Sequence, residues 1–191
     1  FGALALSFYG LSWAARLQGA LPLKPGTDLI LERLPWVDAT PLLSYGFVAL
    51  HAVFFLYWFK REPRRVPYLL AQLALFMLVR NVFIALTPVA APEGILPIYR
   101  GGPMGGFDNT MNFENELFFS GHTATPFLYF LMSRRTPWLA WPCLIFSGLM
   151  GVGVLLTRNH YAIDVVGAWF ITYAVHSLGR KLLGRLDPVK P

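Results

Sequence analysis

Long apolar segments separated by short polar loops dominate the sequence. A transmembrane helix needs about 20 mostly apolar residues, and six segments approach this length, at residues 3–17, 41–59, 67–87, 118–132, 137–157 and 161–178. No internal repeat divides them. The pattern predicts an all-α fold, an integral membrane bundle of six transmembrane helices that forms one domain over residues 1–191.

The composition agrees with a membrane protein. The chain of 191 residues is 55% hydrophobic and 14% charged, whereas a soluble domain carries about 25% charged residues. Its single cysteine, Cys143, lies in an apolar segment, which excludes an intrachain disulfide and a cysteine-based zinc cluster. We expect this thiol to be inert.

The distribution of Lys and Arg predicts the orientation of the bundle, because these residues gather in cytoplasmic loops. Ten of the 16 basic residues lie at positions 60–65, 134–135 and 180–190, with only Glu62 and Asp187 among them. We therefore expect both termini in the cytoplasm and the loops after the first, third and fifth segments on the exterior (periplasmic or lumenal) side. The net charge of +6 then needs no nucleic-acid partner.

Two further expectations concern the beginning of the chain and its membrane. The first segment has neither a cationic flank nor a cleavage pattern, so we do not interpret it as a signal peptide. The chain starts at Phe1 rather than Met, from which we expect a longer N-terminus. The small size and lack of cysteine pairs are compatible with a bacterial inner membrane.

Several polar residues interrupt the apolar segments, and ionisable groups inside a membrane are functional candidates because burying them is costly. They are Arg80 in the third segment, Ser120-Gly121-His122 at the start of the fourth, and Arg158, His160 and Asp164 where the sixth begins. On the predicted topology, all of them fall on the exterior side. This convergence predicts one site.

The residue types predict a phosphate pocket. His160 and Asp164 are four apart on a predicted helix, so the carboxylate can accept the Nδ1 proton and leave Nε2 free. Ser120 and Gly121 stand at a helix N-terminus, which favours an anion. Arg80 and Thr87 are seven apart and share a helix face.

This set of groups fits phosphoryl transfer by covalent catalysis. His160, supported by Asp164, is the predicted nucleophile, and His122 is the predicted general acid. Arg80 and Arg158 would hold the negative charge of the phosphate, with Ser120, Gly121 and Thr87 as further phosphate contacts. No metal and no other cofactor is required by this scheme.

The chain resembles the type 2 phosphatidic acid phosphatase superfamily of six-span lipid phosphatases, whose motifs run K-x6-R-P, P-S-G-H and S-R-x5-H-x3-D. The corresponding stretches here are Arg80-x6-Thr87-Pro88, Phe119-Ser120-Gly121-His122 and His160-x3-Asp164. Arg80 replaces the Lys and Thr87 the Arg, and Gly153-Val154 stand in place of Ser-Arg.

These departures resemble the sphingomyelin synthase branch, with R-x6-T, C-G-D-x3-S-G-H-T and H-Y-T-x-D-V-x3-Y. The chain has Arg80-x6-Thr87, Glu114-Asn115-Glu116-x3-Ser120-Gly121-His122-Thr123 and His160-Tyr161-Ala162-Ile163-Asp164-Val165-x3-Trp169. The spacing is kept throughout. Arg158 belongs to neither pattern, and it is our candidate for the missing phosphate cation.

The resemblance implies a metal-independent enzyme with a phosphohistidine intermediate and a catalytic core at about residues 67–178. A phospholipid would donate its phospho head group and release diacylglycerol, with a lipid alcohol such as ceramide as acceptor. With water as acceptor, the same intermediate would give a phospholipase C-like or phosphatase reaction. Glu116 takes the place of the branch's Asp, and with Glu114 it is a possible head-group contact.

Three other functions compete with this interpretation. A serine protease would use Ser120 with His160, but it leaves Arg80 unexplained. A zinc hydrolase would use His122, His160, Glu116 and Asp164, all acceptable ligand types. A transporter lacks the expected pair of broken, symmetric spans. We interpret His51 and His176 as structural. Residues 101–106 are interpreted as a mobile exterior loop, a flexible connection with a lid as the alternative. The oligomeric state cannot be predicted.

Overall fold

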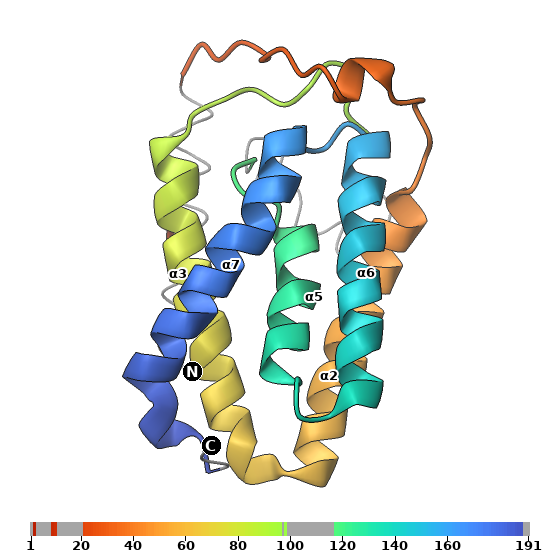
Figure 1. Ribbon diagram of the computed structural model, residues 1–191. Helices are drawn as coiled ribbons and strands as arrows, with labels where there is room; N and C mark the ends of the chain where they lie inside the picture. The colour runs from red at the N-terminus through yellow and green to blue at the C-terminus, as the bar shows by residue number, and fades with distance from the viewer. Residues whose placement is uncertain (1, 3–8, 11–20, 97, 99–116, 189–191) are drawn as a thin grey trace.

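The computed structural model describes residues 2, 9–10, 21–96, 98 and 117–188. Within these residues the fold is helical, apart from an isolated bridge between Pro25 and Ala90 (Figure 1). The main helices are α2 (Phe47–Arg61), α3 (Val66–Leu86), α5 (Gly121–Met132), α6 (Pro137–Leu156) and α7 (Ala162–Leu183). A π-helical segment, η2 (Leu42–Gly46), leads directly into α2, and the short 3-10 helices are η1 (Leu31–Arg33), η3 (Pro63–Arg65) and η5 (Gly184–Leu186).

Four helical segments of the described chain are long and apolar enough to cross a membrane, which makes this an integral membrane protein. They are Leu42–Arg61, Pro63–Leu86, Pro137–Leu156 and Ala162–Leu186. Their bounds lie close to those of the second, third, fifth and sixth predicted segments. The six-span expectation is not confirmed, because most of the first segment, 3–17, lies outside the described residues.

The fourth predicted segment is the one that the structure corrects. Helix α5 begins at Gly121 and contains 12 residues, so it is about 18 Å long at 1.5 Å per residue. A bilayer core is about 30 Å thick. The apolar residues Phe118 and Phe119 extended the hydropathy pattern, but they precede the helix. Thus α5 is shorter than a bilayer core is thick, and it is not among the described helices that are long enough to cross a membrane.

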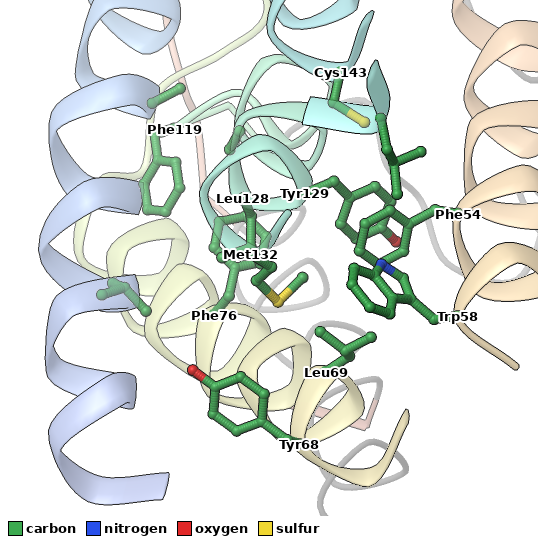
Figure 2. Packing of buried hydrophobic residues seen from close by; sticks show 14 residues of the cluster. Phe54, Trp58, Tyr68, Leu69, Phe76, Phe119, Leu128, Tyr129, Met132 and Cys143 are labelled. Carbon is green, nitrogen blue, oxygen red and sulfur yellow. The ribbon is translucent and has the colours of Figure 1, made fainter. Parts of the chain in front are cut away.

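The core of the bundle lies around α5, which packs against α6 and α7, while α3 packs against α7 (Figure 1). Aromatic side chains fill much of it (Figure 2). Phe54 of α2 stacks on Tyr129 of α5 with ring centroids 3.9 Å apart. Because α5 is wrapped in this way, its polar N-terminus is held in a fixed place among the neighbouring helices.

One end of the bundle carries most of the basic residues, and we call it the basic end. Here α2 ends, α3 begins and α7 ends. Arg65 is buried, lies over the Trp58 ring at 4.4 Å from its centroid, and donates to the carbonyl of Met132 at 3.2 Å. It also pairs with Asp187 at 3.4 Å. The C-terminal end of α5 is thus tied to α2, α3 and the tail.

The opposite end, which we call the strap end, is where α3 ends and α5 and α7 begin. Two segments run across it, the first strap (residues 21–36) and the second strap (residues 87–96) (Figure 1). The bridge between Pro25 and Ala90 joins them. The second strap follows the end of α3, and both straps form hydrogen bonds to the beginning of α7.

Candidate active site

Two hydrogen bonds bring the three sequence motifs together at the strap end. Arg80 of α3 donates its Nε–H to the carbonyl of Phe119 at 3.1 Å. One residue later, the amide of Ser120 donates to the carbonyl of Asp164 in α7, also at 3.1 Å. Residues distant in sequence therefore surround the first turn of α5.

The guanidinium of Arg80 lies against the N-terminus of α5. A Cβ added to Gly121 would lie 3.3 Å from Nε and 3.4 Å from Cζ of Arg80. Such distances are tighter than ordinary contacts, so any larger residue at position 121 would press on the guanidinium. Gly121 thus allows the positive group of Arg80 to approach the helix end closely.

Ser120 is the N-cap of α5 and is fully buried. Its hydroxyl accepts from the amide of Thr123 at 3.4 Å and from the Thr123 hydroxyl at 3.2 Å. An N-cap of this kind satisfies an amide that has no partner inside the helix. In this geometry the Ser120 hydroxyl supports the helix end, and the remaining first-turn amides provide the positive end of the helix dipole.

His122 occupies the second position of α5, against the beginning of the second predicted segment. Its ring forms a hydrogen bond to the backbone of Leu43 in the π-helix η2 and lies 4.6 Å from the Phe47 ring. It also interacts electrostatically with His160 and Arg80. The predicted acid, nucleophile and phosphate cation therefore belong to one cluster.

The expected contact between His160 and Asp164 is present, but its local structure differs from the prediction. The Nδ1 atom of His160 lies 3.4 Å from Oδ2 of Asp164. His160 precedes α7 instead of lying on it, and Tyr161 is the N-cap. The Asp164 carboxylate also accepts from the amide of Tyr161 at 2.9 Å. Both His160 and Asp164 are buried.

The two remaining predicted phosphate contacts, Arg158 and Thr87, lie at the strap end, between α6 and α7 and at the end of α3. Arg158 is in the turn between α6 and α7, with a positive φ of 56°, a conformation that is uncommon for a residue other than glycine. Its side chain leans over Gly94 of the second strap. Thr87 is the C-cap of α3, and its hydroxyl donates to the carbonyl of Phe83 at 2.6 Å.

The possible head-group residues Glu114 and Glu116 lie outside the described residues, as does the loop 101–106. The four-ligand zinc site therefore cannot be compared as a whole. Among the residues that the structure does describe, no three His, Cys, Asp or Glu side chains are grouped so that they could hold a metal ion.

Sequence reasoning missed a polar connection beneath the site. Trp169 of α7 donates to the Ser147 hydroxyl at 2.9 Å, and Ser147 of α6 donates to the carbonyl of Thr123 at 2.7 Å. Nearby, a Cβ on Gly151 would lie 3.0 Å from Val165. The only signal in the sequence was a polar Ser147 among apolar residues. These contacts join α5, α6 and α7 just below the two histidines.

A comparison with protein families agrees with this geometry. Residues 115–181 match the family model described as PAP2 superfamily C-terminal. The match covers about a third of the chain and includes His122, His160 and Asp164 but not Arg80. No curated protein and no solved structure matches the chain. The family match supports a PAP2-type enzyme, a phosphatase or phosphotransferase that acts on membrane phospholipids, without singling out the sphingomyelin synthase-like branch.

Proposed function

We propose that the protein is a membrane lipid phosphotransferase of the sphingomyelin synthase type, which moves a phospho head group from a phospholipid through a phosphohistidine and releases diacylglycerol. The carrying observation is the pair of bonds that join Arg80 to Phe119 and Ser120 to Asp164. Together with the electrostatic interactions of His122 with His160 and Arg80, they support a single site made of a cation, a helix N-terminus and two histidines. Such an arrangement suits the charge of a phosphoryl group in transfer.

In the first step, Nε2 of His160 attacks phosphorus while Asp164 holds the Nδ1 proton. The N–P bond forms, and the bond between phosphorus and the diacylglycerol oxygen breaks. Protonated His122 donates its proton to this oxygen as general acid. Arg80 and the first-turn amides of α5 bind the phosphoryl oxygens, on which charge accumulates.

In the second step, neutral His122 accepts the proton of the acceptor hydroxyl. The acceptor oxygen then forms a bond to phosphorus, the N–P bond breaks and His160 is regenerated. A lipid alcohol and water differ only in what they carry on this oxygen. The reaction needs no metal ion, and protonated His122 is restored for the next cycle.

The other predicted site residues have supporting roles in this proposal. Arg158 supplies a second cation to the phosphate from the turn before His160, and Thr87 contacts the phosphate from the end of α3. Glu116, with Glu114, attracts a cationic head group. The basic end faces the cytoplasm, because Lys and Arg gather there, so the site opens toward the exterior side.

An experiment on lipids tests the function directly. The purified protein is given mixed phosphatidylcholine, phosphatidylethanolamine and phosphatidic acid, with and without ceramide, and the products are identified by mass spectrometry. We expect a phospho-ceramide and diacylglycerol only when ceramide is present. His160→Ala should abolish both products, whereas His176→Ala, which changes a buried histidine of α7, should not. Full activity of His160→Ala would overturn the proposal.

A second candidate is a lipid phosphate phosphatase of the phosphatidic acid type. The match to the PAP2 superfamily favours it, since water can replace the lipid alcohol without any change in the site. Its signature is diacylglycerol and inorganic phosphate from phosphatidic acid in equal amounts with and without ceramide. The same lipid analysis therefore separates the two candidates.

A further inference from the structure

The residues on both sides of His160 are held by the straps. Before it, the Asn159 amide group donates to the carbonyl of Leu96 at 2.7 Å, and the amide of Leu96 donates to the carbonyl of Thr157 at 3.0 Å. After it, the Tyr161 hydroxyl accepts from the amide of Gly26 at 2.8 Å and donates to the carbonyl of Ala90 at 2.9 Å. His160 therefore lies between two anchored neighbours.

Asp28 of the first strap adds a third anchor, on α7 itself. Its Oδ2 accepts from the amide of Ala162, the first residue of α7, at 2.6 Å. Its Oδ1 accepts from the amides of Ile30 at 2.9 Å and Leu31 at 3.1 Å. Both oxygens are used, so this carboxylate connects the strap to the helix that follows the predicted nucleophile.

The protonation states of these groups fit their roles. Partial burial raises the pKa of the Asp28 carboxyl, but the hydrogen bonds from Ala162, Leu31 and Ile30 outweigh it and lower the pKa overall. Burial raises the pKa of the Tyr161 phenol. At neutral pH, Asp28 is therefore an acceptor with full charge, and Tyr161 keeps the proton that it donates to Ala90.

Asp28 also shares with Asp164 the task of accepting hydrogen bonds from the amides at the beginning of α7. The first amides of a helix have no partners within it, and at α7 two carboxylates serve them. Asp28 takes the amide of Ala162, whereas Asp164 takes the amide of Tyr161 and remains beside Nδ1 of His160. Without Asp28, the amide of Ala162 would lose its carboxylate acceptor, and we expect the turn that carries His160 and the Asp164 contact to shift.

We propose that Asp28 and Tyr161 are positioning residues for His160, which fix the turn that presents the imidazole and keep Asp164 on Nδ1. This inference rests on the proposed function, in which His160 is the nucleophile. Neither residue acts on the phosphate. Their loss changes the orientation and the tautomer of His160 and leaves substrate binding to Arg80 and α5.

Two conservative variants test the proposal. Tyr161→Phe removes only the hydroxyl, so the ring can still pack against Leu31 and Leu117. Asp28→Asn keeps the size of the side chain and one acceptor oxygen. The matched controls are Tyr173→Phe, at an exposed tyrosine of α7, and Asp38→Asn, where the carboxylate accepts only from Thr40 among the described contacts.

We expect kcat to fall about tenfold to a hundredfold in each test variant, because small displacements of a reacting group are costly. KM should stay within about twofold of its original value. The second measurement is the ¹⁵N spectrum of histidine-labelled protein, which has only four histidines; the signals of His160 are assigned with His160→Ala. Both test variants should lower the fraction of the Nδ1-protonated tautomer, and both controls should leave it unchanged.

The outcomes separate this inference from the proposed function. Unchanged His160 signals in folded Tyr161→Phe and Asp28→Asn proteins overturn the positioning role, whatever happens to the activity. A rise in KM with unchanged kcat also overturns it, since that assigns both residues to substrate binding. If His160→Ala is fully active, the proposed function fails, while the spectra still report whether the straps hold the imidazole.

Discussion

Two arginines, Arg65 just before α3 and Arg80 in its second half, contact the two ends of α5, and their surroundings differ in an informative way. Arg65 donates to the carbonyl of Met132, the last residue of α5, and Arg80 donates to the carbonyl of Phe119, just before α5 begins. Each is 7% exposed. At the C-terminal end of α5, the cation meets the negative end of the helix dipole, which stabilises it.

Arg80 lies at the positive end of the same dipole, where a cation is unfavourable until an anion joins it. Arg65 has the Asp187 carboxylate and the Trp58 ring among its partners, whereas Arg80 interacts electrostatically with His122. The difference teaches that burial alone does not make an arginine functional. Its position relative to a helix end indicates whether it serves the fold or a ligand.

Exchanging each arginine for methionine should separate the two roles, and the largest effect is expected at Arg80. Arg80→Met removes a charged donor from the proposed phosphate site, so turnover should fall about 10²-fold to 10³-fold with a smaller change in stability. Arg80→Lys should retain more activity, because it keeps the charge and loses the bond to Phe119. Initial rates of diacylglycerol release measure both. Normal turnover in Arg80→Met would show that Arg80, like Arg65, serves only the fold.

Arg65→Met should instead reduce stability, since it removes the buried guanidinium that pairs with Asp187, lies over the Trp58 ring and donates to the carbonyl of Met132. Loss of a hydrogen bond from a charged donor costs about 1.5–3 kcal/mol, while turnover per folded molecule should be unchanged. Cys143 is the one cysteine of the chain and is buried, so its labelling by a thiol dye during heating reports unfolding. The double variant with Asp187→Asn should be less destabilised than the two single changes together, and strict additivity would argue against the pair.

The close approach of Arg80 to α5 can be tested at Gly121. Gly121→Ala would place a Cβ 3.3 Å from Nε of Arg80, so we expect the guanidinium to shift and turnover to fall about tenfold. Gly148→Ala on α6 is the matched control, because a Cβ there meets nothing within 4 Å. This control should be stabilised by about 0.5–1 kcal/mol through helix propensity. Equal activity of both variants would mean that the approach is not needed.

The smallest expected effect is on the pH dependence of the stability that Asp28 of the first strap contributes. The pKa of Asp28 in the folded protein lies below the ordinary 3.8, so this group contributes stability above 3.8 that is lost as the pH falls through the lowered pKa. The difference in unfolding temperature between the original protein and Asp28→Asn should therefore be constant near neutral pH and disappear in strong acid. A difference in unfolding temperature that grows in acid would contradict the lowered pKa of Asp28.

Local spacing rules predicted the parts of the site that depend on neighbours in the sequence. The contact between His160 and Asp164 was predicted from a separation of four residues, although His160 precedes the helix that the rule assumed. Ser120 as a helix start follows from its residue type and its place before an apolar run. The long-range contacts could not be predicted in this way. Nothing in the pattern indicates that Leu43 binds His122 or that Asp28 caps α7, because these contacts depend on how the helices pack.

Hydropathy misled where apolar residues were not helical. Phe118 and Phe119 extend the apolar run before Gly121, so the pattern predicted a longer helix than α5. The count of Lys and Arg residues likewise took no account of burial. It placed Arg65 among the basic loop residues, although its side chain is buried. Composition therefore predicted the class of fold well, and the length of each helix less well.

The shortness of α5 also has a consequence for biosynthesis. A helix of 12 residues buries too little apolar surface to partition into a bilayer on its own, whereas α6 is long enough to do so. Because a tight turn at residues 133–136 joins them, we expect the two to insert together as a hairpin. The candidate site around the first turn of α5 would then assemble only after α6 has been synthesised.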